Sequence, residues 1–367
     1  MEKIVVLHIL EALNCGGIES VVVNICNNMD KERFDVHLLV LSGDDLQLRD
    51  KLNDEVKFHT LGASRRDVMS IVRCYGLTTK IHKMIKEIKP DILHTHCMQF
   101  RLTSTQLAFI GTKYKRYVHT IHTSGLQYEQ KTIKYRIKLW YENIVYKLTK
   151  AEVACVSKDG YNKCKELFPN VPLHLIENGI NIVENPNKVD FIDTAYINMV
   201  YIARLDEGKN QGRLIEAFSL LCQKVDNVRL YLVGDGILMD NLQEQIKQLG
   251  LEGKVFLMGR RNDVIDICSS CQVGVFSSLF EGFSIAAVEM ASVRLPMVVS
   301  NIPALKDVFE DTAIYFDPTS VDEIYEKLLL ICQDEDLRKE LGEKAFGTAK
   351  KYSIKNTARL YQEVYTK

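Results

Sequence analysis

The chain has 367 residues with 47 basic and 48 acidic side chains, and its net charge of −1 argues against a protein whose whole surface is built to hold nucleic acid. Hydrophobic residues make up 46% and charged residues 26%, which is typical of an ordinary globular protein and not of a disordered or fibrous one. At roughly 100–200 residues per domain, this length predicts two or three domains with sizeable cores.

The first ten residues, MEKIVVLHIL, predict a first strand and not a cleaved signal peptide. The sequence also lacks any stretch that approaches the roughly 18 consecutive apolar residues of a membrane-spanning helix. From these two features we expect a cytoplasmic protein.

Short β-branched segments alternate with longer amphipathic ones through the first half, as βαβ units with a parallel sheet require. We predict strands at residues 4–9, 36–41, 92–95, 117–121, 153–156 and 174–176. We predict helices at about 17–30, 68–89, 99–112, 130–150 and 158–168. Together these elements form one doubly wound α/β unit.

The same alternation begins again in the second half of the chain. We predict strands at residues 198–203, 229–233, 255–258, 273–276, 296–299 and 313–315. We predict helices at about 210–224, 238–249, 262–270, 283–293, 320–333 and 335–351. Between the two halves, residues 181–196 are rich in Asn, Pro and Asp and form the candidate linker. We therefore divide the chain into two domains, residues 1–183 and 184–367.

The near-zero net charge is a cancellation, because residues before 189 carry 27 basic and 21 acidic side chains and the rest carry 20 and 27. The segment 113–150 has nine Lys or Arg against two Glu. Its apolar residues recur at helical spacing, namely Ile133, Ile137, Trp140, Tyr141, Ile144 and Leu148. Either this apolar face packs on the core beneath a solvated basic back, which is the commoner case, or the segment rests on anionic lipid headgroups.

The turn after the first predicted strand contains Gly16 and Gly17 and leads into a helix. Glycines at such a turn let the backbone approach a ligand, and the helix start favours an anion, although a lone Gly-Gly turn is weak support for a site. The dinucleotide fingerprint GxGxxG is absent here, and Gly234-Asp235-Gly236 lacks the third glycine because Met239 stands in its place. These sequences disfavour a nicotinamide-dependent oxidoreductase.

Arg204 and Lys209 lie in the segment VYIARLDEGKNQ, where a predicted strand leads through a loop into a helix. Ligands of open α/β sheets bind at the carboxyl ends of the strands, and two cations there suit a diphosphate. The alternative is a pair of solvated surface charges. A lysine near a helix start is unfavourable for the helix, which favours the functional interpretation.

Glu281 and Glu289 flank a second strand-to-helix junction, SSLFEGFSIAAVE. Eight helical residues rise by about 12 Å, more than the roughly 5–9.5 Å between the two carboxylates of a glycosidase, so we expect each to accept hydrogen bonds from a hydroxyl-rich ligand separately. The alternatives are a helix-capping acid at Glu281 and a paired polar residue at Glu289.

The histidines of the first half could be metal ligands or ordinary polar residues of the sheet. His94 and His96 lie two apart on a predicted strand and face one way, whereas His119 and His122 face opposite sides. Because neither pair has acidic ligands nearby, we expect no metal here. A lone histidine at a strand end is more often a satisfied polar residue than a catalyst.

Taken in order, these motifs resemble the nucleotide-sugar glycosyltransferases of the GT-B fold, in particular the retaining family 4. Glu281 and Glu289 reproduce that family's E-x7-E motif, and the likeness covers nearly the whole chain. Further matching segments are CGGIESVVVNI, PDILHTH, VHTIHTSG, VACVSKDG, IENGIN, ARLDEGKNQ, LVGDG and MGRRNDV. One departure is Asn181, where many relatives have Asp.

The resemblance implies a GT-B fold of two Rossmann-like, doubly wound domains facing each other across a cleft, an acceptor-binding N-terminal domain and a nucleotide-sugar-binding C-terminal domain. It also implies that the last helix, about 353–367, packs back on the N-terminal domain. The donor is expected to be a nucleotide-diphosphate sugar, UDP-linked, and the acceptor a saccharide or a lipid-linked hydroxyl. No cofactor and no metal are expected.

The resemblance also implies roles for particular residues. Arg204 and Lys209 would neutralise the leaving diphosphate, Glu281 would contact the transferred sugar, and Glu289 would accept from the ribose hydroxyls. His122 would face the sugar. The other residues expected to line the donor and acceptor sites are Gly16, Gly17, Gly234, Arg260, Asp263, Phe283, Ser284 and Ile285.

The sequence therefore predicts a retaining glycosyltransferase of polysaccharide or glycan biosynthesis, peripheral on the cytoplasmic face of a membrane through 113–150. Three rivals stay open: a sugar-nucleotide epimerase or phosphorolytic enzyme of the same fold, a non-catalytic transferase-like subunit, and an oxidoreductase.

Overall fold

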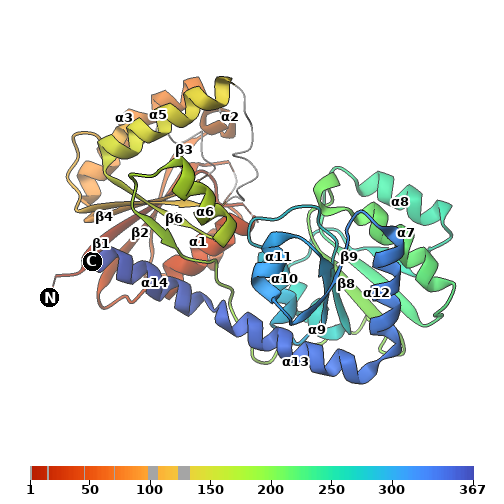
Figure 1. Cartoon of the computed structure of the whole chain (residues 1–367). Coiled ribbons are helices and arrows are strands. Elements are labelled where there is room, and N and C mark those ends of the chain that lie inside the picture. The colour runs from red at the N-terminus through yellow and green to blue at the C-terminus, as the bar shows by residue number, and fades with distance from the viewer. Residues whose placement is uncertain (1, 15, 45, 70, 98–105, 123–132) are drawn as a thin grey trace. The chain divides into compact units, whose positions relative to one another are not determined.

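The computed structural model describes the chain except for residues 1, 15, 45, 70, 98–105 and 123–132. The described chain divides into two compact units (Figure 1). One consists of Met1–Gly179 and Ile354–Lys367, and the other of Ile180–Ser353. The division between the units lies four residues before the domain boundary predicted at 183/184, and the chain returns to the first unit at its C-terminus.

The first unit has a parallel seven-stranded sheet with the order β3-β2-β1-β4-β5-β6-β7. Its strands are β1 (Ile4–Leu10), β2 (Phe34–Ser42), β3 (Lys57–Ala63), β4 (Ile92–Cys97), β5 (Arg116–Ile121), β6 (Ala151–Cys155) and β7 (Leu173–Leu175). Its longer helices are α1 (Gly17–Asn28), α2 (Arg65–Met69), α3 (Ile71–Ile88), α5 (Ile133–Thr149), α6 (Lys158–Leu167) and α14 (Ile354–Thr366). The direction of strand addition reverses between β1 and β4, which is where ligands of doubly wound folds bind.

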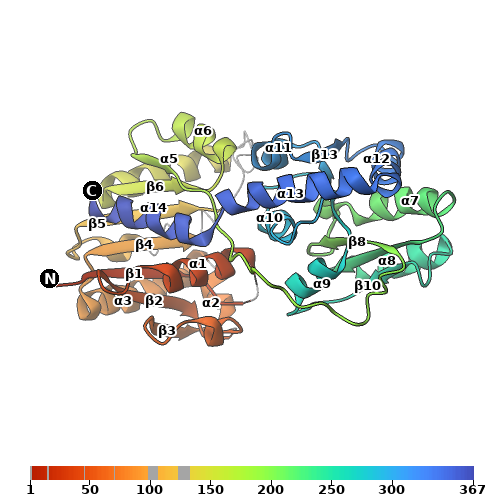
Figure 2. The same ribbon diagram turned by 90° about the horizontal axis from the view of Figure 1, so that it is seen from below.

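The two faces of this sheet are covered by different helices. Leu7 and Ile9 of β1 belong to a buried cluster with residues of α2, α3 and α5. On the opposite face α1 and α14 lie side by side (Figure 2). There, Thr357 of α14 donates to the Glu177 carbonyl at 3.0 Å, and a side chain at Gly179 would meet the Ile354 Cα at 2.6 Å.

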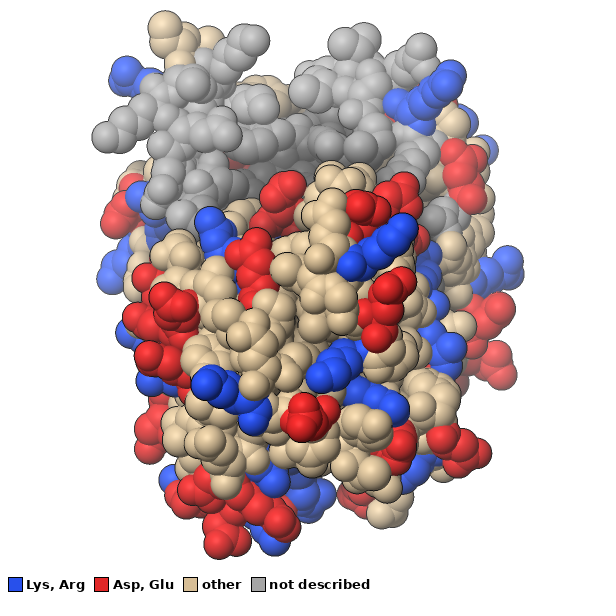
Figure 3. All heavy atoms as spheres, turned by 90° about the vertical axis from the view of Figure 1, so that its right-hand side faces the viewer, with Lys and Arg blue, Asp and Glu red and all other residues tan. Residues whose placement is uncertain are grey.

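The second unit has a parallel six-stranded sheet with the order β10-β9-β8-β11-β12-β13. Its strands are β8 (Ile197–Ile202), β9 (Val228–Val233), β10 (Val255–Leu257), β11 (Val273–Phe276), β12 (Met297–Ser300) and β13 (Ala313–Phe316). Its helices are α7 (Gln211–Cys222), α8 (Met239–Gln248), α9 (Val264–Ser270), α10 (Ile285–Ala291), α11 (Pro303–Phe309), α12 (Val321–Gln333) and α13 (Glu335–Lys351). Here the strand order reverses between β8 and β11. Acidic and basic side chains are intermixed on the face of this unit in Figure 3.

The predictions missed two elements of the structure and differ from it at a third place. The sequence did not predict β3, whose exposed Lys57 begins an edge strand with little apolar alternation. It also missed α11, a seven-residue helix that starts at Pro303. The helix predicted at 99–112 lies partly outside the described residues, and within them Leu107–Phe109 forms a 3-10 turn.

Candidate functional site

The candidate site of the second unit lies at the carboxyl ends of β8 and β11, where the sheet changes direction. Arg204 and Lys209 follow β8, and Glu281 follows β11. The two strands pair directly, with Met199 opposite Val273. Strand order therefore brings together two loops that are more than 70 residues apart in the sequence.

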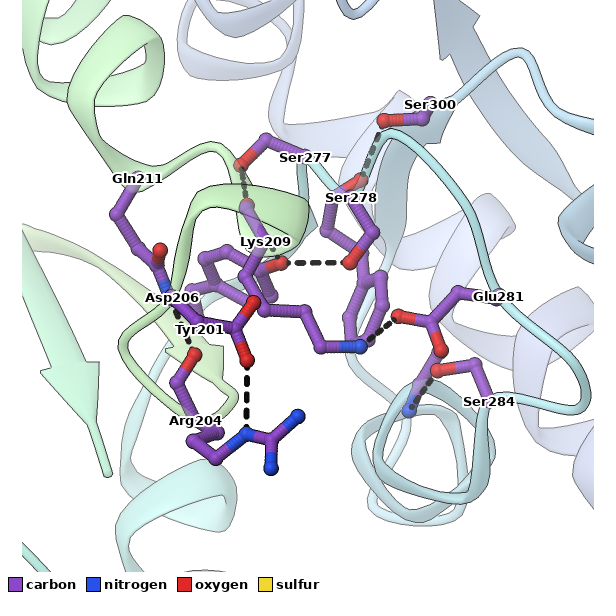
Figure 4. Close-up of polar contacts among 12 residues, drawn as sticks. Tyr201, Arg204, Asp206, Lys209, Gln211, Ser277, Ser278, Glu281, Ser284 and Ser300 are labelled. Atoms are coloured by element: carbon purple, nitrogen blue, oxygen red, sulfur yellow. Dashed lines mark hydrogen bonds and ion pairs between the residues drawn. The ribbon is translucent and has the colours of Figure 1, made fainter. Parts of the chain in front are cut away.

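The main chain at Lys209 is fixed by side chains from both strands (Figure 4). Its carbonyl accepts from the Tyr201 hydroxyl at 2.9 Å and from the Ser277 hydroxyl at 3.0 Å. The next residue, Asn210, has a left-handed backbone with φ of 57°, and its amide donates to the carbonyls of Ser277 and Pro318 at 3.2 and 2.8 Å. The loop is thus held in one conformation by buried polar contacts, which are strong when fully satisfied.

Lys209 and Glu281 point toward each other and form an ion pair (Figure 4). The Lys209 Nζ lies 2.5 Å from the Glu281 Oε1, and the side chains are only 20% and 11% exposed. A largely buried pair of this kind needs both partners, since removing one leaves an uncompensated charge. The sequence predicted both residues at the site, but not this contact.

Arg204 has a different partner and a different environment. Its Nε donates to Asp206 Oδ2 at 2.7 Å, and its side chain is 77% exposed. Its carbonyl accepts from the Gln211 side chain at 2.9 Å. Arg204 is therefore an exposed cation, whereas Lys209 is a shielded one. The sequence reasoning missed Asp206, although an acid two residues after the arginine was a usable signal.

The start of α10 holds the predicted residues Phe283, Ser284 and Ile285. Ser284 caps the helix, since its hydroxyl accepts from the Ala287 N–H at 3.4 Å. Phe283 is buried, and its ring meets that of Tyr352 edge to face at 5.2 Å. Glu289 lies half-buried in the same helix, next to the buried residues Val288 and Met290.

Gly234 follows β9 in a backbone conformation that only glycine adopts readily, with φ of 146°. Its N–H donates to the Gly259 carbonyl at 2.9 Å. A Cβ at this position would lie 1.9 Å from the Ala203 carbonyl oxygen, so the glycine lets β9 close against the loop that carries Arg204. The need for glycine here is thus explained by the protein's own backbone.

The predicted residues Arg260 and Asp263 lie before α9, but the contact of Asp263 is with a residue that the sequence reasoning did not select. Arg261 donates to both carboxylate oxygens of Asp263, at 2.8 and 2.5 Å. This hydrogen bonding lowers the pKa of the Asp263 carboxyl. Arg260 itself is exposed.

In the first unit, Gly16 caps α1 and Gly17 begins it. The space beside Gly16 holds the Glu19 carboxylate, because a Cβ there would lie 2.1 Å from Glu19 Oε2. An acid in the first turn suits the helix dipole but repels an incoming anion. The Glu19 carboxylate therefore lies at the helix start, where the dipole favours an anion.

His122 follows β5 and is 9% exposed. Its Nε2 lies 3.3 Å from His96 Nδ1, so the two rings share one face of the sheet. His119 faces the other side, where its Nδ1 lies 2.7 Å from Thr95 Oγ1. The predicted opposite orientation of His119 and His122 is confirmed.

His94 and His96 face one way, as predicted, and His8 of β1 lies beside them. One ring nitrogen of each lies within 4.8 Å of the others, a spacing that would fit a metal ion. However, His94 already has partners for both nitrogens, the Tyr365 hydroxyl at 2.5 Å and the Thr120 hydroxyl at 2.7 Å. The three residues form part of a hydrogen-bonded network.

Two family models match the chain in succession. The model described as Glycosyltransferase Family 4 matches residues 15–184, and the model described as Glycosyl transferases group 1 matches residues 183–348. Together with the two parallel-sheet units, they define the class: the chain is a glycosyltransferase of the GT-B fold.

Curated relatives agree with this class. A Campylobacter jejuni N-acetylgalactosamine-N,N'-diacetylbacillosaminyl-diphospho-undecaprenol 4-alpha-N-acetylgalactosaminyltransferase is 24% identical in an alignment of 364 positions that covers 95% of each chain. An Escherichia coli UDP-Gal:alpha-D-GlcNAc-diphosphoundecaprenol alpha-1,3-galactosyltransferase is 26% identical over 324 residues, covering 82% of this chain and 80% of the relative.

Among solved structures, HepE of Anabaena in complex with UDP and glucose superposes with a TM-score of 0.80 at 18% identity, over 99% of both chains. This likeness shows the fold. The chain therefore belongs to the GT-B glycosyltransferases, with a family 4 first half and a group 1 second half. Among the described helices, none is both long and apolar enough to cross a membrane.

Proposed function

We propose that this glycosyltransferase moves a sugar, with retention of configuration, from a UDP-sugar to a hydroxyl of a saccharide or lipid-linked acceptor in glycan biosynthesis. The observation that carries the proposal is the Lys209–Glu281 pair at the change of strand direction between β8 and β11. The names of the two bacterial relatives, which specify diphospho-undecaprenol acceptors, support the acceptor class. The UDP-bound HepE structure supports the donor.

Lys209 and Arg204 would stabilise the negative charge that develops on the diphosphate as it leaves. Lys209 is shielded, so its charge acts in a medium of low dielectric, where electrostatic stabilisation is strongest. Arg204 is exposed and can turn toward a ligand by leaving Asp206. We propose that these two cations, and no metal ion, supply the positive field.

The remaining donor contacts would come from α10, from the loop before it and from residues near β9 and α9. Glu281 is oriented by Lys209 and would contact the transferred sugar. Glu289 would accept hydrogen bonds from the ribose hydroxyls, and the backbone of residues 283–285 would lie near the sugar. Gly234, Arg260 and Asp263 would border the nucleotide.

Acceptor binding is assigned to the first unit. The Glu19 carboxylate beside Gly16 favours a neutral hydroxyl ligand there. His122 would face the transferred sugar. In the transfer step, the bond between the sugar's anomeric carbon and the diphosphate oxygen breaks, while the acceptor oxygen bonds to the same face of that carbon. The acceptor's proton passes to the leaving phosphate, which balances the step.

A panel of nucleotide sugars, each with and without a bacterial lipid extract, tests the proposal. We expect free UDP and an acceptor one sugar heavier, with the donor's anomeric configuration retained in the product's NMR spectrum. Donor isomerisation without UDP release would indicate an epimerase, and phosphate-dependent breakdown would indicate a phosphorolytic enzyme. The absence of any reaction with every donor would indicate a non-catalytic subunit, and a requirement for nicotinamide would indicate an oxidoreductase. Each of these four results contradicts the proposal.

We also propose that α5 rests on an anionic membrane on the cytoplasmic side. The sequence left open whether its apolar stripe packs on the core, and the structure places much of that stripe at the surface. Ile133, Ile137, Trp140 and Leu148 are exposed at 77%, 60%, 65% and 60%. The core is contacted instead by Glu142, Val145 and Tyr146, and the Tyr146 hydroxyl donates to Glu142.

Exposed basic side chains border this apolar surface, among them Arg136, Lys147 and Lys150. Basic charge beside exposed Trp and Ile is the combination that binds at the headgroup level of anionic bilayers. A large apolar side chain left in water loses the stabilisation that burial would give it. A membrane would supply that burial.

Replacing Ile137 and Trp140 together by serine should weaken binding to vesicles containing phosphatidylglycerol by about a hundredfold or more, since each large side chain contributes about 1.5–3 kcal/mol when buried and each 1.4 kcal/mol is about tenfold. The measurement is vesicle co-sedimentation at low salt. The matched control is Leu249→Ser, which removes an exposed apolar side chain from the second unit. Wild-type protein that ignores anionic vesicles at low salt would overturn the membrane proposal.

A further inference from the structure

Three histidine rings form a hydrogen-bonded chain at the change of strand direction in the first unit. His8 Nδ1 lies 2.9 Å from His96 Nε2, and His96 Nδ1 lies 3.3 Å from His122 Nε2. The rings come from β1, from β4 and from the residue after β5. Parallel register places Leu10 opposite His96 and His96 opposite Thr120, so the chain crosses three neighbouring strands on one face.

All three rings are neutral at ordinary pH. Burial lowers the pKa of His8 to about 3 and that of His122 to about 3, and it holds the pKa of His96 well below its usual value. A neutral imidazole has one N–H and one lone pair. The hydrogen bonds along the chain must therefore all run in the same direction.

Two arrangements satisfy this condition. In the first, His8 Nδ1 donates to His96 Nε2, and His96 Nδ1 donates to His122 Nε2. This leaves a lone pair on His8 Nε2 and an N–H on His122 Nδ1. The second arrangement reverses both bonds, and it leaves an N–H on His8 Nε2 and a lone pair on His122 Nδ1.

The positions of the two ends in the sheet decide between the arrangements. Within the described part of the chain, neither His8 Nε2 nor His122 Nδ1 has a hydrogen-bond partner. A buried N–H without a partner is a rarer and costlier defect than an unused acceptor. His8 is 0% exposed and His122 is 9% exposed. Both end atoms are covered in this structure, but His122 follows β5 at the carboxyl edge of the sheet, where ligands of doubly wound folds bind, whereas His8 lies within β1. The unpaired N–H therefore belongs at the His122 end, where a bound ligand can accept from it.

His94 does not compete for this chain, although its ring lies 3.8 Å from that of His96. Its Nδ1 contacts the Tyr365 hydroxyl and its Nε2 contacts the Thr120 hydroxyl. Thr120 in turn contacts the Tyr361 hydroxyl at 2.9 Å. His94 thus joins the sheet to α14, and the three-ring chain runs past it to His122.

We propose that His8 and His96 are positioning residues that fix His122 in the tautomer whose Nδ1 carries the proton, so that His122 donates a hydrogen bond to a substrate oxygen. The assignment of that oxygen to a hydroxyl or phosphate of the sugar donor rests on the proposed function. The tautomer itself does not, because it follows from two ring contacts and from the position of His122 at the carboxyl edge of the sheet. His122 then acts as a donor and not as a general base.

The tautomer can be read directly by NMR of the full-length protein labelled with ¹⁵N-histidine, assigned with His122→Gln. We expect His122 to show a protonated Nδ1 and an unprotonated Nε2 at pH 7.5 without ligand. In His96→Leu the donor to Nε2 is lost, and the protonated-Nε2 form should appear. His96→Asn keeps a donor at the position of Nδ1 and should restore the wild-type signals.

We also expect kcat/KM to fall roughly tenfold in His96→Leu and to recover largely in His96→Asn. The loss is smaller than the 10²–10³-fold cost of removing an oriented donor completely, because His122 itself is still present. If His96→Leu does not fold, His8→Leu and His8→Asn provide the same comparison one ring further along. A protonated Nε2 in the wild-type protein, or an unchanged His122 tautomer in both leucine variants, would overturn the proposal. One equivalent of tightly bound zinc, lost in His8→Leu, would do so too, because the ring nitrogens would then be ligands. A correct tautomer with unchanged transfer kinetics would contradict only the proposed role of His122 in transfer.

Discussion

Replacing Lys209 by methionine should lower kcat for sugar transfer by about 10²–10³-fold, the cost of removing one preorganised stabiliser of developing charge. The Lys209 ammonium lies 2.5 Å from Glu281 in a largely buried position, so in its absence solvent cannot easily stabilise the negative charge of the leaving group. The same change should also destabilise the second unit by about 1–3 kcal/mol, since it leaves the Glu281 carboxylate without its partner. Steady-state kinetics and denaturant unfolding measure the two effects separately.

The double variant Lys209→Met, Glu281→Gln distinguishes catalysis from structure. Removing both charges takes away the uncompensated carboxylate, so stability should recover, whereas activity should not. Lys247→Met, which changes an exposed lysine in α8, is the matched control for loss of one positive charge. Near-normal transfer by the single variant would show that the site is wrongly assigned, and recovery of activity in the double variant would show that the pair is only structural.

How much of this site the sequence could predict depends on strand order. The pattern of apolar segments located β8, β11 and the loops after them to within one or two residues. It did not contain the information that β8 and β11 are neighbours, because β9 and β10 come between them in the chain. The contact between Lys209 and Glu281, across 72 positions, follows only from that order. The resemblance to a family supplied the two residues, but not their pairing.

Helical periodicity had a comparable limit in α5. It correctly predicted a helix and an apolar stripe, but it could not tell which side meets the sheet. Tyr146 packs on the core, whereas Trp140 is exposed. The buried side of the helix carries an acid, Glu142, so its hydropathy does not identify it as the side that is buried. The cost of burying the Glu142 carboxylate is reduced by the hydrogen bond that it accepts from Tyr146 in the same helix. A hydropathy pattern does not contain this hydrogen bond.

The histidines show a third limit. Strand alternation predicted that His94 and His96 share a face and that His119 and His122 do not, and both statements are confirmed. His8 was not selected, because a single histidine in a first strand carries no signal by itself. It becomes significant only because β1 and β4 are adjacent, which places it 2.9 Å from His96.

The first unit should unfold when the pH falls from 7 to about 4.5, while the second unit stays folded. Six histidines of the first unit are buried. Five of them have strongly lowered pKa values, namely His8, His94, His96, His119 and His122, and the pKa of the sixth, His37, is lowered by burial against the opposing effect of Asp35. Burial lowers the pKa of His119 to about 4 and those of His8 and His122 to about 3, and it holds the pKa values of His94 and His96 well below 6.5. In the unfolded chain they titrate near 6.5, so below that pH the unfolded state binds more protons than the folded state.

Stability gained from a lowered histidine pKa is complete above pH 6.5 and is lost as the pH falls toward the folded-state values. One pH unit below 6.5, each such group costs about 1 kcal/mol, and five together approach the 5–15 kcal/mol that stabilises a typical domain. Asp35 and Asp91 have lowered pKa values as well, but they act below pH 4 and leave the window from 4.5 to 6.5 to the histidines.

The second unit is an internal control for this effect, because all nine histidines of the chain lie at or before residue 174. The single tryptophan, Trp140, reports on the first unit, and hydrogen exchange corrected for intrinsic rates reports on both. His119→Asn should reduce the pH dependence of unfolding of the first unit by about one proton between pH 4.5 and 6.5. Equal acid sensitivity of the two units, or an unchanged slope in this variant, would show that the buried histidines do not set the acid limit. In that case the surface charges shared by both units would be the cause.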